Sequence, residues 1–140
     1  SNEGYGFYAR YEDLMSKIKS GKQIMIGRSS DFCMLPPRLA WGAHTHLALV
    51  SSMGRMLVVL LSELAYLKKG KGQKLIGLAA DDTLSLLCTL HEGDSIRLVA
   101  GRRSFTMKPD VWAGYVGARG RKGKWLPKGF AQVAELEVKE

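Results

Sequence analysis

The sequence predicts an all-β fold built from repeated units, and three observations lead to this prediction. Short runs of apolar and aromatic residues alternate with turn-forming clusters of Gly, Ser, Asn and Asp. A four-residue motif that begins with glycine recurs at a constant interval. Residues 132–138 alternate polar and apolar side chains, as a closing strand does. We therefore expect a single domain over residues 1–140, with its repeats packed radially or as a solenoid.

The repeated motif carries a glycine, two mostly polar residues and then an apolar residue. Its copies are Gly21-Lys22-Gln23-Ile24, Gly72-Gln73-Lys74-Leu75 and Gly123-Lys124-Trp125-Leu126, with successive glycines 51 residues apart. An apolar or aromatic run lies upstream of each unit, at residues 5–14, 55–64 and, more weakly, 103–112. These runs indicate about three blade-like repeats of roughly 51 residues.

Within the units, the turn residues place the strands. We expect strands at residues 46–50, 55–61, 83–90, 95–99, 104–108 and 132–138. Residues 55–69 also fit an amphipathic helix that Gly70 would stop. The β-branched pair Val58 and Val59 favours a strand, followed by a helical turn near residues 62–67.

Composition excludes several classes of protein. The 140 residues are 46% apolar, which suits one packed core, and the longest apolar run, residues 56–61, is far too short to span a bilayer. Residues 1–6 are polar and do not resemble a secretory signal. Two cysteines cannot form a disulfide framework. We expect a cytoplasmic domain without membrane contact.

The charge distribution points to a polyanionic partner. Lys and Arg number 21 against 13 Asp and Glu, so the net charge is +8. The cations gather in acid-free stretches: Lys17, Lys19, Lys22 and Arg28; Lys68, Lys69, Lys71 and Lys74; Arg119, Arg121, Lys122, Lys124 and Lys128. Such clusters favour nucleic acid, because neutralised phosphates release condensed counterions. The alternative is a set of solvated loops kept basic for solubility.

Glycines interrupt these basic stretches. We expect Gly70, Gly72, Gly117, Gly120 and Gly123 to adopt positive φ and to bring the backbone close to phosphates. Repeats around an axis would align the basic loops on one rim, where they would hold curved duplex DNA. No helix-turn-helix or zinc-finger pattern is present, so we expect binding that depends little on base sequence.

Several stretches resemble the C-terminal domains of ParC, a subunit of topoisomerase IV, within the gyrase A/ParC family. They are Gly4-Tyr5-Gly6-Phe7, Leu35-Pro36-Pro37, Gly54-Arg55-Met56-Leu57, residues 69–74 and residues 117–123. The resemblance covers essentially the whole chain. It implies a β-pinwheel, a propeller-like disc of four-stranded blades, and about three blades here where the family usually has five or more.

The resemblance also implies a function. Family members are non-catalytic DNA-bending domains that position DNA for relaxation and decatenation during chromosome segregation. ATP and magnesium would be used elsewhere in the parent enzyme, and the partners would be double-stranded DNA, the rest of ParC and the ParE protein, at the nucleoid. We expect DNA contacts from Lys68, Lys69, Lys71, Lys74, Arg119, Arg121, Lys122 and Lys124, and second from Arg102, Arg103, Lys108, Lys128 and Lys22.

The chain departs from the gyrase pattern in one place. Gyrase A domains carry a Gln-Arg-Arg-Gly-Gly-Arg/Lys-Gly box for chiral wrapping, whereas residues 67–72 have Leu for Gln and lack one glycine. This departure predicts bending without a gyrase-type wrap. The equivalent domain of gyrase A remains an alternative, as does a propeller-like disc whose basic rim binds an acidic protein.

Other candidate sites are explained by structure rather than chemistry. No nucleophile or phosphate-loop motif is present. We expect no metal site from His44, His46, Cys33, Cys88 and His91, because no close cysteine pair is present. We interpret Tyr11 as a blade residue, and Asp81-Asp82 as turn residues. Trp41, Trp112 and Trp125 would stack on bases if exposed, but their spacing favours the core or blade junctions, least clearly for Trp125, which lies beside a basic cluster.

Overall fold

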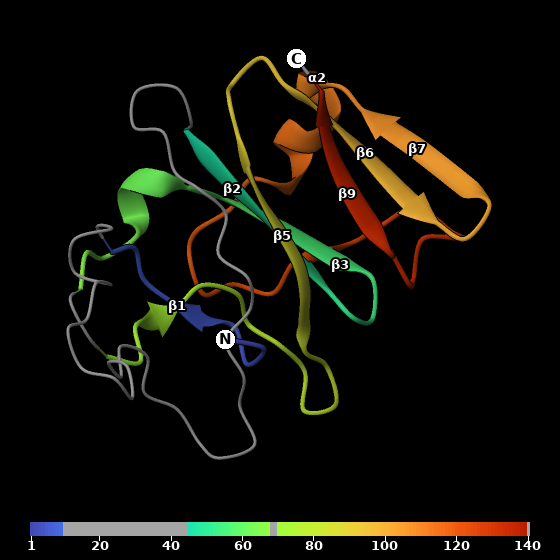
Figure 1. Cartoon of the computed structure of the whole chain (residues 1–140). Coiled ribbons are helices and arrows are strands. Elements are labelled where there is room, and N and C mark those ends of the chain that lie inside the picture. The colour runs from blue at the N-terminus through green and yellow to red at the C-terminus, as the bar shows by residue number, and fades with distance from the viewer. Residues whose placement is uncertain (10–44, 68–69, 140) are drawn as a thin grey trace, which may run out of the picture.

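The computed structural model describes residues 1–9, 45–67 and 70–139, and these ranges are dominated by β-strands (Figure 1). The strands are β1 (Tyr5–Gly6), β2 (His46–Ser51), β3 (Arg55–Leu60), β4 (Gln73–Lys74), β5 (Leu84–Leu90), β6 (Ser95–Ala100), β7 (Arg103–Met107), β8 (Lys124–Trp125) and β9 (Glu135–Lys139). Helical structure in these ranges is limited to α2 (Pro109–Trp112) and the 3-10 turns η1 (Leu61–Glu63) and η2 (Ala113–Tyr115). The predicted all-β class is confirmed.

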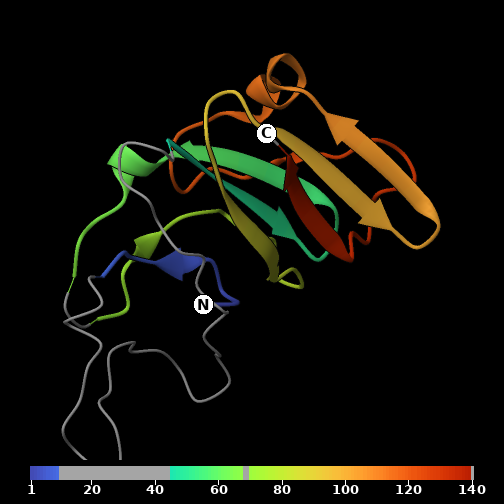
Figure 2. The same ribbon diagram turned by 45° about the horizontal axis from the view of Figure 1, so that its top comes forward.

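The strands form three antiparallel sheets. Their orders are β1-β4, β5-β2-β3-β8 and β7-β6-β9. The sheets follow one another across the molecule, from the β1-β4 pair at the lower left of Figure 1 to the β6-β7-β9 sheet at the upper right, and Figure 2 shows the same succession. The sheets follow the order of the repeats, so the three-unit organisation predicted from the sequence is present.

The motif strand of one repeat completes the sheet of the repeat before it. In β4, Gln73 pairs with Gly6 of β1, and in β8, Lys124 pairs with Met56 of β3. The backbone amide that follows each motif strand makes an equivalent hydrogen bond to the same partner segment. Leu75 N–H donates to the Gly4 carbonyl at 2.7 Å, and Leu126 N–H donates to the Gly54 carbonyl at 2.8 Å. The motif is therefore a strand-exchange element.

The remaining strands repeat as well. The antiparallel arrangement of β5, β2 and β3 recurs as β9, β6 and β7. In this correspondence β7 takes the place of β3. Among the described residues no strand pairs with the outer edge of β7, which lies at the periphery in Figure 1.

The motif glycines are required by this exchange. A Cβ on Gly123 would lie 2.6 Å from the carbonyl carbon of Met56, and a Cβ on Gly72 would collide with the Gly6 carbonyl. The predicted positive φ is confirmed at Gly70, Gly72 and Gly120 but is wrong at Gly117 and Gly123. At Gly123, the missing side chain allows two backbones to cross, and no unusual φ is needed.

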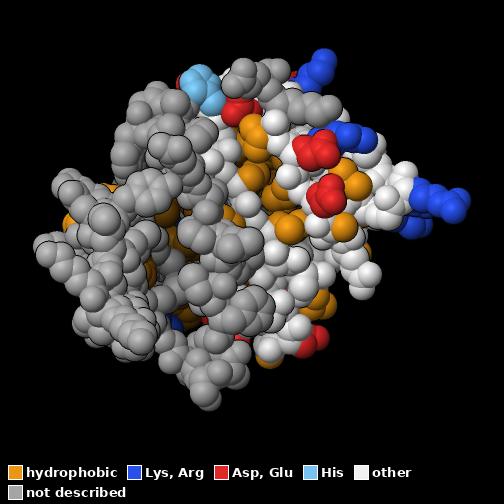
Figure 3. All heavy atoms as spheres, in the orientation of Figure 1, with side chains coloured by type: hydrophobic (Ala, Val, Ile, Leu, Met, Phe, Trp, Pro, Cys, Tyr) orange, Lys and Arg blue, Asp and Glu red, His pale blue; other side chains and the backbone are white. Residues whose placement is uncertain are grey.

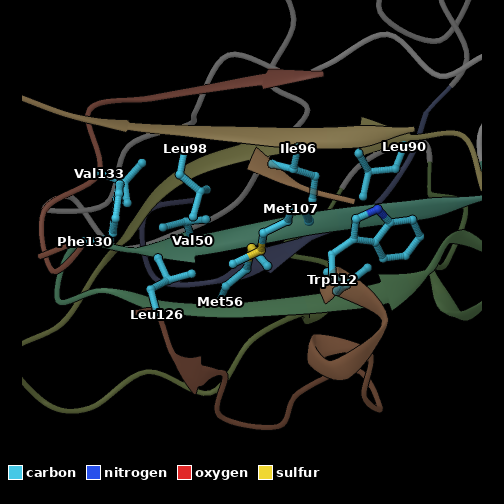
Figure 4. Close-up of a cluster of buried hydrophobic side chains, with 12 residues drawn as sticks. Val50, Met56, Leu90, Ile96, Leu98, Met107, Trp112, Leu126, Phe130 and Val133 are labelled. Carbon is cyan, nitrogen blue, oxygen red and sulfur yellow. The ribbon is translucent and has the colours of Figure 1, made fainter. Parts of the chain in front are cut away.

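Two apolar clusters lie between successive sheets. One joins Leu75 and Ile76 to residues of β2, β3 and β5. The other joins Leu126 to residues of the second and third sheets and includes Met56, Ile96 and Trp112, as Figure 4 shows. The last residue of each motif thus enters an equivalent core, which fixes the exchanged strand to both neighbouring sheets.

The predicted strands are confirmed, with one-residue shifts at several ends and a three-residue shift at the start of β9. Strand β9 begins at Glu135 rather than at residue 132, because Val133 enters the core before pairing is established. Residues 55–60 form β3, as the valine pair predicted, and the 3-10 turn η1 follows. The turn ends at Glu63, before the predicted limit, because Tyr66 forms a bridge with Tyr8.

Replacing the motif glycine tests the exchange. We expect Gly123→Ala to lower the free energy of unfolding by about 1–3 kcal/mol, since its Cβ would overlap the Met56 backbone. Gly93→Ala is the matched control, because a Cβ there meets nothing within 4 Å. Urea denaturation measures both. Equal stability of the two variants would contradict a steric role for Gly123.

Burial also sets the chemistry of one thiol. Cys88 on β5 packs against the second cluster, and burial, with a smaller contribution from the charge of Asp94, raises its pKa to about 12. The thiolate is the reactive form of cysteine. At pH 8 only about one such thiol in 10,000 is ionised, compared with roughly one in four at an unperturbed pKa.

Alkylation kinetics check this pKa. In a Cys33→Ser variant, we expect iodoacetamide at pH 8 to label Cys88 at least ~100-fold more slowly in the native protein than in urea. Mass spectrometry gives both rates. Comparable rates would show that the Cys88 thiol is not held in the core.

Candidate nucleic-acid interface

The two cation-rich segments that the structure describes, residues 70–77 and 117–124, lie against each other. Gly77 N–H donates to the Arg121 carbonyl at 2.8 Å, and Gly120 N–H donates to the Leu75 carbonyl at 2.9 Å. The Arg119 guanidinium donates to the Lys74 carbonyl at 2.8 Å. We call the cations brought together here the cationic seam: Lys71, Lys74, Arg119, Arg121 and Lys122.

The cationic seam is accessible, and within the described ranges no ion pair joins it to a carboxylate. All its side chains are exposed except that of Arg119, which is half-buried. Residues 64–80 and 117–128 contain no Asp or Glu. Over the described parts of the chain, the salt bridge seen is Arg97–Glu137, at 3.1 Å, in the third sheet. The seam therefore presents concentrated positive charge to solvent.

The corner of β3 and β8 adjoins the second segment. Arg55 pairs with Trp125 in register, and its guanidinium lies 4.0 Å from the centroid of the indole ring. The same guanidinium donates to the Gly123 carbonyl at 3.0 Å. Lys124 is exposed, and as the neighbour of Trp125 in a strand it points to the opposite side of the sheet.

Trp125 itself is 57% exposed. The prediction that it packs in the core or at a blade junction is wrong, because Leu126 fills the core position of the motif. Trp112 is confirmed as a core residue, 3% exposed, and its indole N–H donates to the Asp94 carbonyl at 2.8 Å.

The described cations that were predicted as secondary DNA contacts lie in two separate places. The Arg103 guanidinium lies against Gly129, where an added Cβ would collide with it. Lys128, the residue before Gly129, is exposed. Arg102 occupies the neighbouring β6–β7 turn. Figure 3 shows Lys and Arg side chains protruding at the right of the molecule, where Figure 1 draws this turn. Lys108 follows the far end of β7, about 17 Å from Arg103 at the usual strand rise, so it does not join this group.

Sequence reasoning missed two residues and placed others beyond the described structure. Arg55 and Tyr5 stand at the start of equivalent strands, and each forms a cation–aromatic pair, Arg55 with Trp125 and Tyr5 with Lys71 at 4.2 Å. Both residues pair with a motif strand, so the pairing of the apolar runs with the motif strands is the signal that could have identified them. The following predicted residues lie outside the described ranges: Lys22, Lys68, Lys69, Tyr11, Cys33, Trp41 and His44.

The remaining candidates have structural partners. The buried Asp82 carboxylate accepts hydrogen bonds from the Met53 and Thr83 amides at 3.1 and 2.9 Å, which confirms a turn role. His46 makes an edge contact with Trp112, and burial lowers its pKa. In the described part of the chain, no three His, Cys, Asp or Glu residues gather as metal ligands, and no helix is long and apolar enough to cross a membrane.

Known proteins provide an independent comparison. The A subunit of DNA topoisomerase 4 from Pseudomonas aeruginosa is 36% identical over 144 aligned positions, which cover 99% of this chain and 19% of that protein. The Haemophilus influenzae protein of the same name is 32% identical and covers the whole chain. The chain belongs to the family of topoisomerase IV A subunits, the ParC proteins. It spans about a fifth of the length of these relatives.

Solved structures agree with this assignment. The E. coli ParC C-terminal domain matches with a TM-score of 0.82 and 26% identity, over 99% of this chain and 58% of that one. A crystal structure of the C-terminal domain of DNA topoisomerase IV matches in fold, with a TM-score of 0.74 at 16% identity. No family model matches the chain. The predicted β-pinwheel fold is confirmed.

Proposed function

We propose that this domain binds double-stranded DNA along the cationic seam and bends it, as a non-catalytic part of the ParC protein of a bacterial topoisomerase IV. One observation carries the proposal: exposed cations of two successive repeats meet in one seam, and no described carboxylate neutralises them. Duplex DNA is a polyanion that would bind such a seam favourably, because each phosphate that a cation neutralises releases condensed counterions.

The elements that carry the seam favour phosphate contacts over base readout. The cations come from loops and two-residue strands, and the described α-helix, α2, has four residues. An α-helix that reads the major groove is longer, and β-ribbon readers use extended strands. Binding is therefore expected to depend on the sugar–phosphate backbone and on the flexibility of the duplex.

Bending follows from the succession of repeats. The seam lies where β4 of the first sheet and the segment before β8 of the second sheet meet, and the Arg55 and Lys124 corner of the second sheet follows. Arg102 and Arg103 belong to the third sheet and its turn, with Lys128 nearby. A duplex that touches successive corners of a disc must curve around it. Smooth bending of a 20–30 bp site costs about 1–6 kcal/mol, which several phosphate contacts can offset.

We place the chemistry of the parent enzyme outside this domain. The chain corresponds to about a fifth of the P. aeruginosa topoisomerase 4 relative. We propose that strand cleavage, with its ATP and magnesium, belongs to the rest of the enzyme, including the ParE protein. The domain would then position DNA for relaxation and decatenation at the nucleoid, in the cytoplasm.

The gyrase alternative has less support. Residues 67–72 lack the glutamine and one glycine of the gyrase box, and the relatives described above belong to topoisomerase 4. We therefore propose bending without a gyrase-type wrap.

Salt dependence of DNA binding tests the seam. We expect Lys71→Ala combined with Arg121→Ala to reduce the slope of log affinity against log salt by about 1.8, since each lost phosphate contact removes about 0.9. Fluorescence anisotropy with a 30 bp duplex at several salt concentrations measures the slope.

The matched control removes two charges elsewhere. Arg97→Gln with Lys139→Gln changes the net charge equally, and both residues lie in the third sheet. This control should keep the slope of the unmodified chain. Equal slopes for all three proteins would remove the seam from the DNA contact surface.

A second experiment measures bending directly. With a donor and an acceptor on the two ends of a 30 bp duplex, we expect saturating protein to raise energy transfer above that of free DNA. The seam variant should raise it less at equal occupancy, because fewer phosphates hold the curve. Binding without any change in energy transfer would contradict bending and favour a basic interaction disc.

A further inference from the structure

Trp125 is an exposed side chain that the structure holds in place. It is the most exposed of the large hydrophobic residues in the described ranges. Backbone pairing with Arg55 fixes its strand, and the Tyr115 hydroxyl donates to its carbonyl at 3.4 Å. The Arg55 guanidinium lies over the indole ring and is itself held by the Gly123 carbonyl. This indole is supported from one direction by a fixed cation and is accessible to solvent elsewhere.

The fold does not need an indole at this position. In the preceding repeat the residue equivalent to Trp125 is Lys74, which is exposed, while the next residue, Leu75, enters the core. Leu126 has the same core role beside the second sheet. Trp125 therefore occupies a position that in the neighbouring unit belongs to the cationic seam.

The equivalent corner shows the same pairing of chemistries. At the β1–β4 corner the Lys71 ammonium lies 4.2 Å from the centroid of the Tyr5 ring, and at the β3–β8 corner Arg55 lies over Trp125. An aromatic ring and a cation thus stand together at both corners. Such a pair offers a polyanion one ionic group and one flat apolar group at the same point.

We propose that Trp125, positioned by Arg55, is a non-ionic contact to the backbone of duplex DNA. This inference rests on the proposed function. Its open indole surface would pack against deoxyribose, and its N–H is a donor suited to a phosphate oxygen. The seam cations supply attraction that weakens with salt, whereas this contact would supply affinity that does not.

Salt titration separates the two kinds of contact. We expect Trp125→Ala to lower affinity for a 30 bp duplex by about tenfold at every salt concentration, with an unchanged slope. Lys74→Ala, at the equivalent position of the preceding repeat, should instead reduce the slope by about 0.9. Trp125→Phe keeps an aromatic surface and should recover most of the affinity.

Fluorescence reports the contact itself. DNA should change the tryptophan emission of a Trp41→Phe variant, but not that of Trp41→Phe combined with Trp125→Phe, since the remaining Trp112 is buried. Circular dichroism and the thermal midpoint should show that each variant is folded.

The outcomes are distinguishable. If the unmodified chain binds duplex DNA but Trp125→Ala binds equally well at every salt concentration, the inference is wrong while the proposed function stands. If Trp125 responds more strongly to a single strand than to a duplex of the same sequence, it stacks on bases, which also overturns the inference. If the unmodified chain binds no DNA, the proposed function fails first.

Discussion

The backbone crossing at the motif glycine is the constraint on which the rest of the structure depends. At Gly72 and Gly123, a short strand passes so close to the inner strand of the preceding sheet that a side chain has no room. The crossing places Leu75 and Leu126 in successive cores and leaves the preceding residues, Lys74 and Trp125, in solvent. One local steric requirement therefore links three small sheets, none of which could bury both faces alone.

The cationic seam is a consequence of the same crossing. The segment that leads into β8 lies along the segment that follows β4, and backbone hydrogen bonds through Gly77 and Gly120 hold the two together. Like charges are thereby placed near one another on a rigid backbone, which costs stability through repulsion. Backbone bonding, which does not depend on charge, keeps the cations in place until a polyanion neutralises them.

The sequence was informative where a pattern is local and repeated. Alternating apolar residues and turn clusters predicted β2, β3, β5, β6 and β7, and the interval between motif glycines predicted the repeat of about 51 residues that separates β4 from β8. The exchange of strands between repeats was not predicted. Position along the chain could not reveal what each glycine faces. Gly117 and Gly123 were expected to have positive φ, and neither does. Gly123 is required instead because the Met56 backbone of β3, distant in sequence, leaves no room for a side chain.

The site was predictable as a set of charges but not as a surface. Clustering identified Lys71, Lys74, Arg119, Arg121 and Lys122, yet only the fold shows that two segments 45 residues apart touch, through Arg119 and Lys74. The exposure of Trp125 was mispredicted because tryptophan is usually buried, and the residue after it takes the core position. Arg55 was missed because its role depends on a partner across the sheet.

Completion of each sheet by the following unit restricts how such a disc can change in size during evolution. The Gly6–Gln73 and Met56–Lys124 pairs occupy the same register in their sheets. If one whole unit is gained or lost, each sheet is therefore still completed by a motif strand in the correct register. A deletion that shifts a motif strand against its partner would set a bulky residue where glycine must cross. Discs of this kind can therefore grow or shrink by duplication or loss of entire units, and the length of arc they offer changes in the same steps.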